Sequence, residues 1–162
     1  MPIREATPED FDGIWPFFHE IAAAGETFAY APDTTRDEGL KLWFGPQHRV
    51  FVYEDDGAIL GTYYLRPNQP GLGGHVCNCG YMVAPAARGR GIARALGEHS
   101  HATAIALGFK AMQYNFVVST NEQAVRLWQK LGMKIVARLP KAYQHARLGY
   151  VDALVMYKWL AD

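Results

Sequence analysis

The chain has 162 residues, of which 49% are hydrophobic and 20% are charged, proportions that exclude a disordered protein and indicate an ordinary globular one. Sixteen lysine and arginine residues balance sixteen aspartate and glutamate residues, so no net charge attracts nucleic acid or an anionic membrane. We therefore expect a single domain over residues 1–162, with neither nucleic acid nor membrane as a partner. A cytoplasmic location is also expected, because the apolar runs are short and the first residues do not resemble a signal peptide.

The two cysteines, Cys77 and Cys79, are too few for a disulfide framework. In a strand their spacing places both thiols on one face, with Cα atoms about 6.5–7 Å apart. That separation is too wide for two thiolates on one zinc ion unless the strand bends. His75 extends the same face, but we expect reduced, half-buried thiols and no metal.

In the first half of the chain the patterns predict two helices among four strands. Thr7 and Pro8 begin the first helix, and Pro16 predicts a kink or a break within it. The second helix is expected over about 33–44 and ends at Gly45-Pro46. The strands are expected over residues 2–6, 49–54, 58–65 and 76–83.

In the second half, helices and strands alternate. One helix follows residue 91, and Ser119 with Glu122 predicts a capping box for another that ends at Gly132. Strands are expected over residues 111–118, 134–139 and 150–159. The resulting order, β-α-α-β-β-β-α-β-α-β-β, predicts an α/β (α+β) fold with a mixed, mostly antiparallel sheet of six to seven strands and helices on both faces.

The most informative segment joins the strand over 76–83 to the helix that follows it, and it reads Arg88-Gly89-Arg90-Gly91-Ile92-Ala93-Arg94. The first N–H groups of a helix have no intrahelical partner, and small residues let a diphosphate approach them closely. A P-loop is excluded because no Gly-Lys-Ser/Thr follows, and the dinucleotide fingerprint fails at Arg94, where a small residue belongs. A glycine turn with solvated arginines is the alternative interpretation.

This turn resembles the signature of the GNAT (GCN5-related N-acetyltransferase) superfamily, Gln/Arg-x-x-Gly-x-Gly/Ala, which Arg88, Gly91 and Ala93 match. Residues 121–133 are similar to the helix motif that follows in the family, and the order of elements agrees across nearly the whole chain. The resemblance implies an acetyl-CoA-dependent N-acetyltransferase without a metal. It also implies which residues contact coenzyme A: the main chain of Met82 and Val83 and the side chain of Asn121 at the pantetheine arm, and the amides of Gly89, Arg90, Gly91, Ile92, Ala93 and Arg94 at the pyrophosphate.

The chemistry requires a neutral amine, an oxyanion donor and a proton for the departing thiol. An alkylamine with a pKa of about 10.4 is neutral in only about one molecule in a few thousand at pH 7. The resemblance implies a main-chain oxyanion donor on the fourth strand, for which Val83 is the candidate. It also implies a tyrosine as proton donor at the position of Trp128, whose indole is no useful acid.

Four residues are candidates to replace that missing tyrosine, namely Tyr81, Tyr114, Tyr143 and Cys79. Trp128 itself is expected at the cofactor site, with packing in the core as its alternative role.

Three asparagines, Asn78, Asn115 and Asn121, resemble those of the fungal acetyltransferases that act on proline analogues such as azetidine-2-carboxylate. This resemblance implies that Asn78 and Asn115 are the catalytic pair and hold the substrate or a water where two strands separate. The alternative is that both amides satisfy main-chain groups at a bulge.

We therefore expect direct attack, in a ternary complex, by the amine of a small or amino-acid-like acceptor. A protein N-terminal or lysine acetyltransferase and a non-catalytic CoA-binding sensor remain as alternatives, and a homodimer is left open.

Overall fold

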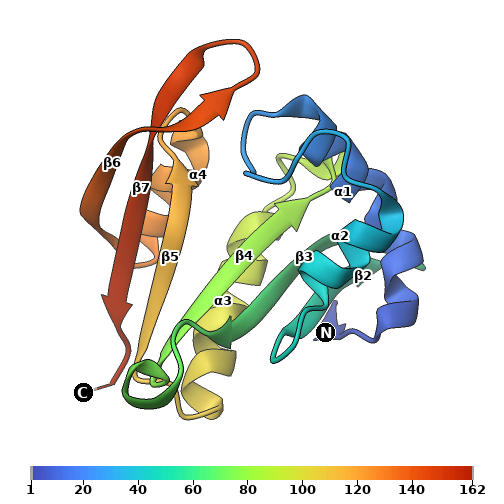
Figure 1. The fold of residues 1–162 in the computed structure, drawn as a ribbon. Helices are drawn as coiled ribbons and strands as arrows, with labels where there is room; N and C mark the ends of the chain where they lie inside the picture. Colours follow the sequence, from blue (N-terminus) through green and yellow to red (C-terminus); the bar gives the residue numbers. More distant parts are fainter. Residues whose placement is uncertain (1, 162) are drawn as a thin grey trace.

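The computed structural model describes residues 2–161, and its strands form one seven-stranded sheet in the order β1-β2-β3-β4-β5-β7-β6 (Figure 1). The parallel pair is β4 with β5, and the other neighbours are antiparallel. This confirms the predicted mixed, mostly antiparallel sheet. The strands are β1 (Ile3–Glu5), β2 (Arg49–Asp55), β3 (Ala58–Pro67), β4 (Val76–Val83), β5 (Ala111–Val118), β6 (Lys134–His145) and β7 (Gly149–Trp159).

Helices pack on both faces of the sheet (Figure 1). They are α1 (Phe11–Ala24), α2 (Arg36–Trp43), α3 (Ile92–Ala106) and α4 (Glu122–Lys130), with short 3-10 turns η1 (Pro8–Asp10), η2 (Gly71–Gly73) and η3 (Pro85–Ala87). On β2, Phe51 belongs to the core of α3 and α4, whereas Val50 and Val52 belong to the core of α1 and α2. Successive residues of a strand point to opposite faces, so one apolar strand serves two helix layers.

Pro16 predicts a kink or a break in the first helix. α1 continues through this proline from Phe11 to Ala24, so the break that Pro16 predicted does not occur. A proline removes one helical hydrogen bond. Ile14 and Phe18 on the apolar face are fully buried, and tertiary packing of this kind supplies most of the stability of a helix in a protein.

The capping box predicted at Ser119 is wrong. Asn121 is the N-cap of α4, and its side chain makes no capping hydrogen bond. The N–H of Ser119 instead donates to the carbonyl of Asp152 at 3.0 Å, so the chain still follows β7 at this point. The helix therefore begins only after the ladder ends. The strand predicted over 134–139 is also longer than expected and extends to His145.

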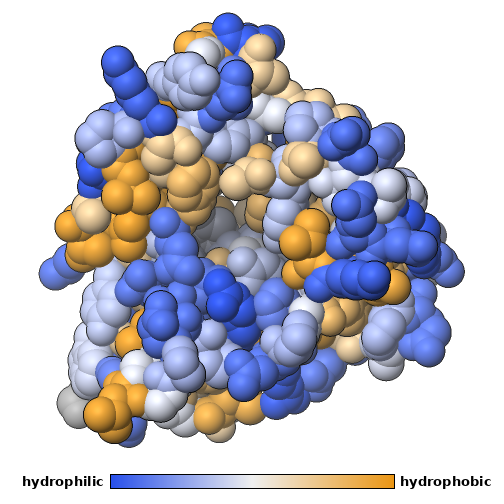
Figure 2. Space-filling model, viewed as in Figure 1, coloured by the Kyte–Doolittle hydropathy of each residue, from blue (hydrophilic) through white to orange (hydrophobic). Residues whose placement is uncertain are grey.

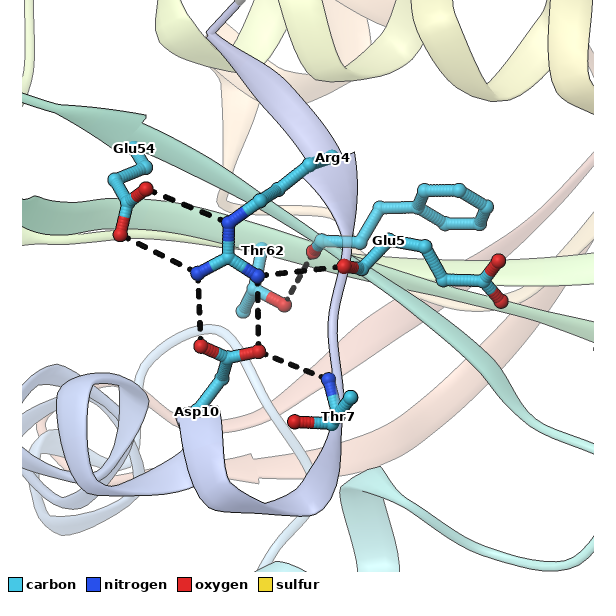
Figure 3. A network of polar contacts seen from close by, with 7 residues as sticks. Arg4, Glu5, Thr7, Asp10, Glu54 and Thr62 are labelled. Carbon is cyan, nitrogen blue, oxygen red and sulfur yellow. Dashed lines mark hydrogen bonds and ion pairs between the residues drawn. The ribbon is translucent and has the colours of Figure 1, made fainter.

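Arg4 ties the first strand to the elements around it (Figure 3). Its guanidinium donates to the carboxylate of Asp10 at 2.8 and 3.0 Å and to Glu54 on β2 at 3.3 and 3.4 Å. Asp10 also accepts from the N–H of Thr7 at 2.9 Å. The hydrogen bond from Arg4 is the main cause of the lowered pKa of Asp10. The network holds the start of α1 against β2.

Cys77 and Cys79 are both unpaired and buried, where half-buried thiols were expected. Within residues 2–161 no cluster of His, Cys, Asp and Glu side chains is placed to hold a metal ion. Over the same range, none of the helices has the length and apolar character needed to cross a bilayer.

Candidate active site

The sheet opens between β4 and β5. Their ladder pairs residues 76–78 with residues 111–113 and then ends. β5 is irregular between Tyr114 and Val117, and the two strands diverge beyond the ladder (Figure 1). Figure 2 shows the molecule hollowed at this level. Main-chain groups that would pair within a continuous sheet are left without a ladder partner here.

The register of β3 against β4 determines which main-chain groups face this gap. The N–H of Ala84 donates to the carbonyl of Leu60 at 2.8 Å, and pairs in an antiparallel ladder alternate. The N–H and C=O of Met82 therefore face β3, while those of Tyr81 and Val83 face the gap. This orientation suits Val83 as a main-chain donor to an oxyanion. It favours Tyr81 over Met82 as the second main-chain contact.

A cleft of about 430 Å³ lies against the turn between β4 and α3. Its lining contains nearly all the predicted cofactor-binding residues, namely Met82, Val83, Arg88, Gly89, Gly91, Ile92, Ala93, Arg94, Asn121 and Trp128. Arg90 is the exception, because its guanidinium points to the carboxylate of Asp55 at 3.0 Å, in the turn between β2 and β3. The residues predicted to contact coenzyme A therefore line one cleft, apart from Arg90.

The geometry of the turn fits a diphosphate. Gly89 and Gly91 have φ angles of +82° and +77°, and the space where a β-carbon would stand is open to at least 4 Å in both cases. Only glycine adopts such angles readily. The first helical hydrogen bond of α3 runs from the N–H of Ala95 to the carbonyl of Gly91, so the N–H groups ahead of Ala95 have no helical acceptor. Free donors at the positive end of a helix favour an anion.

A second cavity of about 280 Å³ opens from the same gap. It shares Tyr81, Asn121 and Trp128 with the cleft, so the two spaces meet where β4 and β5 diverge. Much of its wall is aromatic and comes from Phe28, Tyr30, Tyr64, Tyr114 and Phe116. A long ligand in the cleft can thus present its end to a smaller molecule in the cavity.

Asn78 and Asn115 both line this cavity, but they do not bond to each other. Asn78 is buried, donates to the carbonyl of Gln113 at 3.0 Å and accepts from the hydroxyl of Tyr64 at 3.2 Å. Asn115 donates to Asn68 at 2.8 Å and accepts from the side chain of Gln113 at 3.0 Å. Asn78 therefore makes a hydrogen bond to a main-chain carbonyl where the ladder ends, which is the alternative role considered for it.

Two buried phenols meet at the junction of cleft and cavity. The hydroxyl oxygens of Tyr81 and Tyr114 are 2.9 Å apart, and that of Tyr81 is 2.6 Å from Ser100 Oγ. Ser100 donates to the carbonyl of Gly97 at 2.7 Å. The hydrogen of Tyr81 is therefore directed to Ser100, and that of Tyr114 to Tyr81. Burial raises the pKa of both phenols, so they stay protonated at neutral pH.

The other candidates for the proton donor are less suitably placed. Tyr143 is not part of the lining of the cavity, and its hydroxyl donates to the carbonyl of Phe28 at 2.9 Å. Burial raises the pKa of the Cys79 thiol, which keeps it neutral in the core. Trp128 is 6% exposed, and its ring lies 4.5 Å from that of Tyr81, centroid to centroid. It both packs in the core and lines the two spaces.

The turn between β6 and β7 contacts the loop between α1 and α2 (Figure 1). The N–H of Ala146 donates to the carbonyl of Gly25 at 2.9 Å, and Arg147 pairs with Glu26 at 2.6 Å. Phe28 in this loop lines both the cleft and the cavity. No local pattern in the sequence signals this contribution, because it depends on contacts between residues 121 positions apart.

Comparison with known proteins identifies the family. The family model described as "Acetyltransferase (GNAT) family" matches residues 14–133. The chain belongs to the GNAT family. A GCN5-related N-acetyltransferase from Kribbella flavida is 45% identical, with 98% of this chain and 96% of that chain covered and a TM-score of 0.92. This GNAT domain is thus an acetyl-CoA-dependent acyltransferase.

Two further comparisons limit what can be concluded about this chain from its relatives. The N-acetyltransferase aca1 of Schizosaccharomyces pombe is 36% identical over 99 residues, which are 60% of this chain and 47% of that protein. The chain thus spans about half the length of this curated relative. A phosphinothricin acetyltransferase from Sinorhizobium meliloti, solved with acetyl-CoA, has a TM-score of 0.85 at 21% identity, with 99% of this chain and 90% of that chain covered. That likeness shows the fold.

Proposed function

We propose that residues 1–162 form a single N-acetyltransferase domain that acetylates the amine of a small or amino-acid-like molecule by direct attack in a ternary complex. The observation that carries this proposal is that the cleft and the cavity meet at the gap in the sheet and share Tyr81, Asn121 and Trp128. Acetyl-CoA supplies the activated acetyl group. The chain supplies the groups that bind the two substrates, the main-chain dipoles that face the oxyanion, and the proton for the departing thiol.

We assign the pyrophosphate to the N–H groups between Gly89 and Arg94, with Arg88 beside them in the cleft. Among the arginines of this turn, Arg90 and Arg94 pair with Asp55 and Glu98, whereas Arg88 is in none of the ion pairs found within residues 2–161. Its charge is therefore available to phosphate. The side chain of Asn121 lines the route from this turn to the gap.

At the gap, the proposed donor to the developing oxyanion is the N–H of Val83, which the strand register directs away from β3. The proposed source of the proton for the departing thiol is Tyr81, because it lines both spaces and remains protonated. For this transfer the O–H bond must rotate from Ser100 toward the sulfur while the phenol oxygen stays where it is. Tyr114 and Ser100 hold its hydroxyl in place. Asn115, with Asn78 behind it, is proposed to position the acceptor or a water, as in the azetidine-2-carboxylate acetyltransferases that the chain resembles.

The size and charge of the cavity support a small acceptor over a protein. A volume of about 280 Å³ lies just below the range of small-molecule sites. None of its lining residues is acidic, so a basic peptide finds no complementary charge there. A protein N-terminus or lysine therefore fits less well than a compact amine.

A thiol-release assay with acetyl-CoA and a panel of amines, amino acids and peptides tests this function. We expect release with a small amine or amino acid. Release with peptides alone would indicate the protein acetyltransferase, and tight CoA binding without release from any member of the panel would indicate the sensor.

The role of Tyr81 has its own test. Tyr81→Phe is expected to lower kcat by about a hundredfold while leaving the Kd for acetyl-CoA nearly unchanged, since general acid catalysis contributes about that factor. Tyr53→Phe, on β2 outside both spaces, is the matched control. A Tyr81→Phe enzyme with the kcat of this control would contradict the assignment.

Two further expectations are also proposals. We propose a homodimer through β6, an edge strand with Ile135, Val136 and Leu139 exposed, because such edges readily pair with another chain. Light scattering at micromolar concentration tests the homodimer, with Val136→Lys expected to yield the monomer.

The two unpaired thiols support the proposed cytoplasmic location.

A further inference from the structure

Two arginines differ from all the others in this chain. Eight of the ten arginines form ion pairs with carboxylates within residues 2–161, namely Arg4, Arg36, Arg49, Arg90, Arg94, Arg126, Arg138 and Arg147. Arg66 and Arg88 are in none of these pairs. Arg88 lines the cleft assigned to the cofactor, and Arg66 lines the cavity assigned to the acceptor. The two guanidinium groups that form no ion pair therefore lie one in each ligand space.

Arg66 lies where an acceptor would be held. It is half-buried on β3 and stands opposite Asn78 on β4 in the ladder, so the two side chains share a face of the sheet. Tyr64 and Gly80 form the next pair on that face. A β-carbon at Gly80 would stand 2.4 Å from the ring of Tyr64, so the glycine is what lets this ring lie across β4 beside Arg66.

The surroundings of Arg66 leave its charge unbalanced. Arg66 is the single charged residue in the lining of the cavity, amid aromatic rings. Burial raises the pKa of Tyr30 and Tyr64, and the positive charge of Arg66 opposes this shift at both phenols, which shows that the guanidinium is close to them. A partly desolvated cation without an anionic partner is costly, and a carboxylate matches the planar fork of a guanidinium with two parallel hydrogen bonds.

We propose that Arg66 binds a carboxylate of the acceptor, so that the molecule acetylated is an amine that also carries an acid, such as an amino or imino acid. The inference rests on the proposed function and narrows its substrate class. Arg66 is then the residue that selects acceptors with a negative charge, and the aromatic wall accommodates the carbon skeleton between the amine and the carboxylate of the acceptor.

The experiment compares acids with their carboxamides, which keep the amine and lose the negative charge. In thiol-release assays on a panel of amino and imino acids, Arg66→Gln is expected to raise KM for the acids about tenfold to a hundredfold, the range of a charged hydrogen bond. KM for the matching carboxamides is expected to change less than about twofold. Arg126→Gln is the control, since it removes an equal charge from an exposed position whose pair with Glu122 lies outside the cavity.

Three outcomes would overturn the inference. They are a wild-type preference for carboxamides over acids, an equal rise in KM for both in Arg66→Gln, and no rise in either. Titration calorimetry of the CoA-loaded protein with the same acids and carboxamides separates this inference from the proposed function. Acid binding that Arg66→Gln abolishes would support the role of Arg66 even without thiol release, whereas acid binding that this variant retains would refute it.

Discussion

At Gly91 the main chain has a φ of +77°, and the space beside its α-carbon is open. A side chain there has two separable effects. The left-handed conformation costs a residue other than glycine roughly 1–2 kcal/mol, and the added atoms enter the space proposed for the pyrophosphate. The first effect acts on folding, and the second acts on the ligand.

Gly91→Leu is therefore expected to raise the Kd for acetyl-CoA at least about tenfold, equivalent to about 1.4 kcal/mol, as measured by calorimetry. Gly108→Leu is the matched control, because Gly108 follows the opposite end of α3, also has a positive φ (+90°) and also has open space around it. Its Kd should stay at the wild-type value. A Kd that is unchanged in Gly91→Leu would contradict the placement of the pyrophosphate.

Among the elements, α4 depends most on one side chain. Trp128 is the one buried residue of this helix, and its ring contacts Tyr81 and Tyr114 at centroid distances of 4.5 and 5.3 Å. The helix is nine residues long and has no side-chain cap, so its own hydrogen bonds give it little stability. Packing of Trp128 holds it against the sheet.

Trp128→Ala is expected to lower the free energy of unfolding by about 3–5 kcal/mol, the usual cost of removing a buried aromatic side chain. Trp159→Ala, at a site 54% exposed on β7, should change it by less than about 1 kcal/mol. Urea unfolding followed by circular dichroism measures both. Similar losses in the two variants would show that α4 is held by other contacts.

Across the whole molecule, the two cores bury tyrosines whose phenols must remain neutral. Burial raises the pKa of Tyr63, Tyr64, Tyr81 and Tyr114. In the unfolded chain a phenol ionises at a pKa of about 10. Above that pH the unfolded state binds fewer protons than the folded state, and unfolding is favoured.

The free energy of unfolding is thus expected to be insensitive to these phenols below about pH 9 and to fall as the pH rises through about 10. Urea midpoints between pH 8 and 11, with tyrosinate absorbance recorded on the same samples, measure the effect. Tyrosinate that forms in the folded protein without loss of stability would contradict this.

Much of the fold was predictable because its signals are local. Alternation of apolar residues indicated the strands, and turn chemistry placed their ends to within a few residues, except at β6, which extends to His145. Of the kink or break predicted at Pro16, the break does not occur, because the buried face that carries α1 through the proline consists of contacts made by distant elements. The capping box predicted at Ser119 is wrong for a related reason, because the N–H of Ser119 donates to the carbonyl of Asp152, 33 positions later.

By itself, the sequence determined the order of elements and indicated the turn that is proposed to bind an anion, because a helix start, two glycines and three arginines are adjacent along the chain. Only the tertiary structure decided which side chains line the cavity at the gap between β4 and β5. Arg66 comes to the cavity through its pairing with Asn78, and Phe28 comes to it through the hydrogen bond of its carbonyl with Tyr143 on β6. Such neighbours are set by strand register and by loop contacts between distant segments, for which a single sequence carries no local signal.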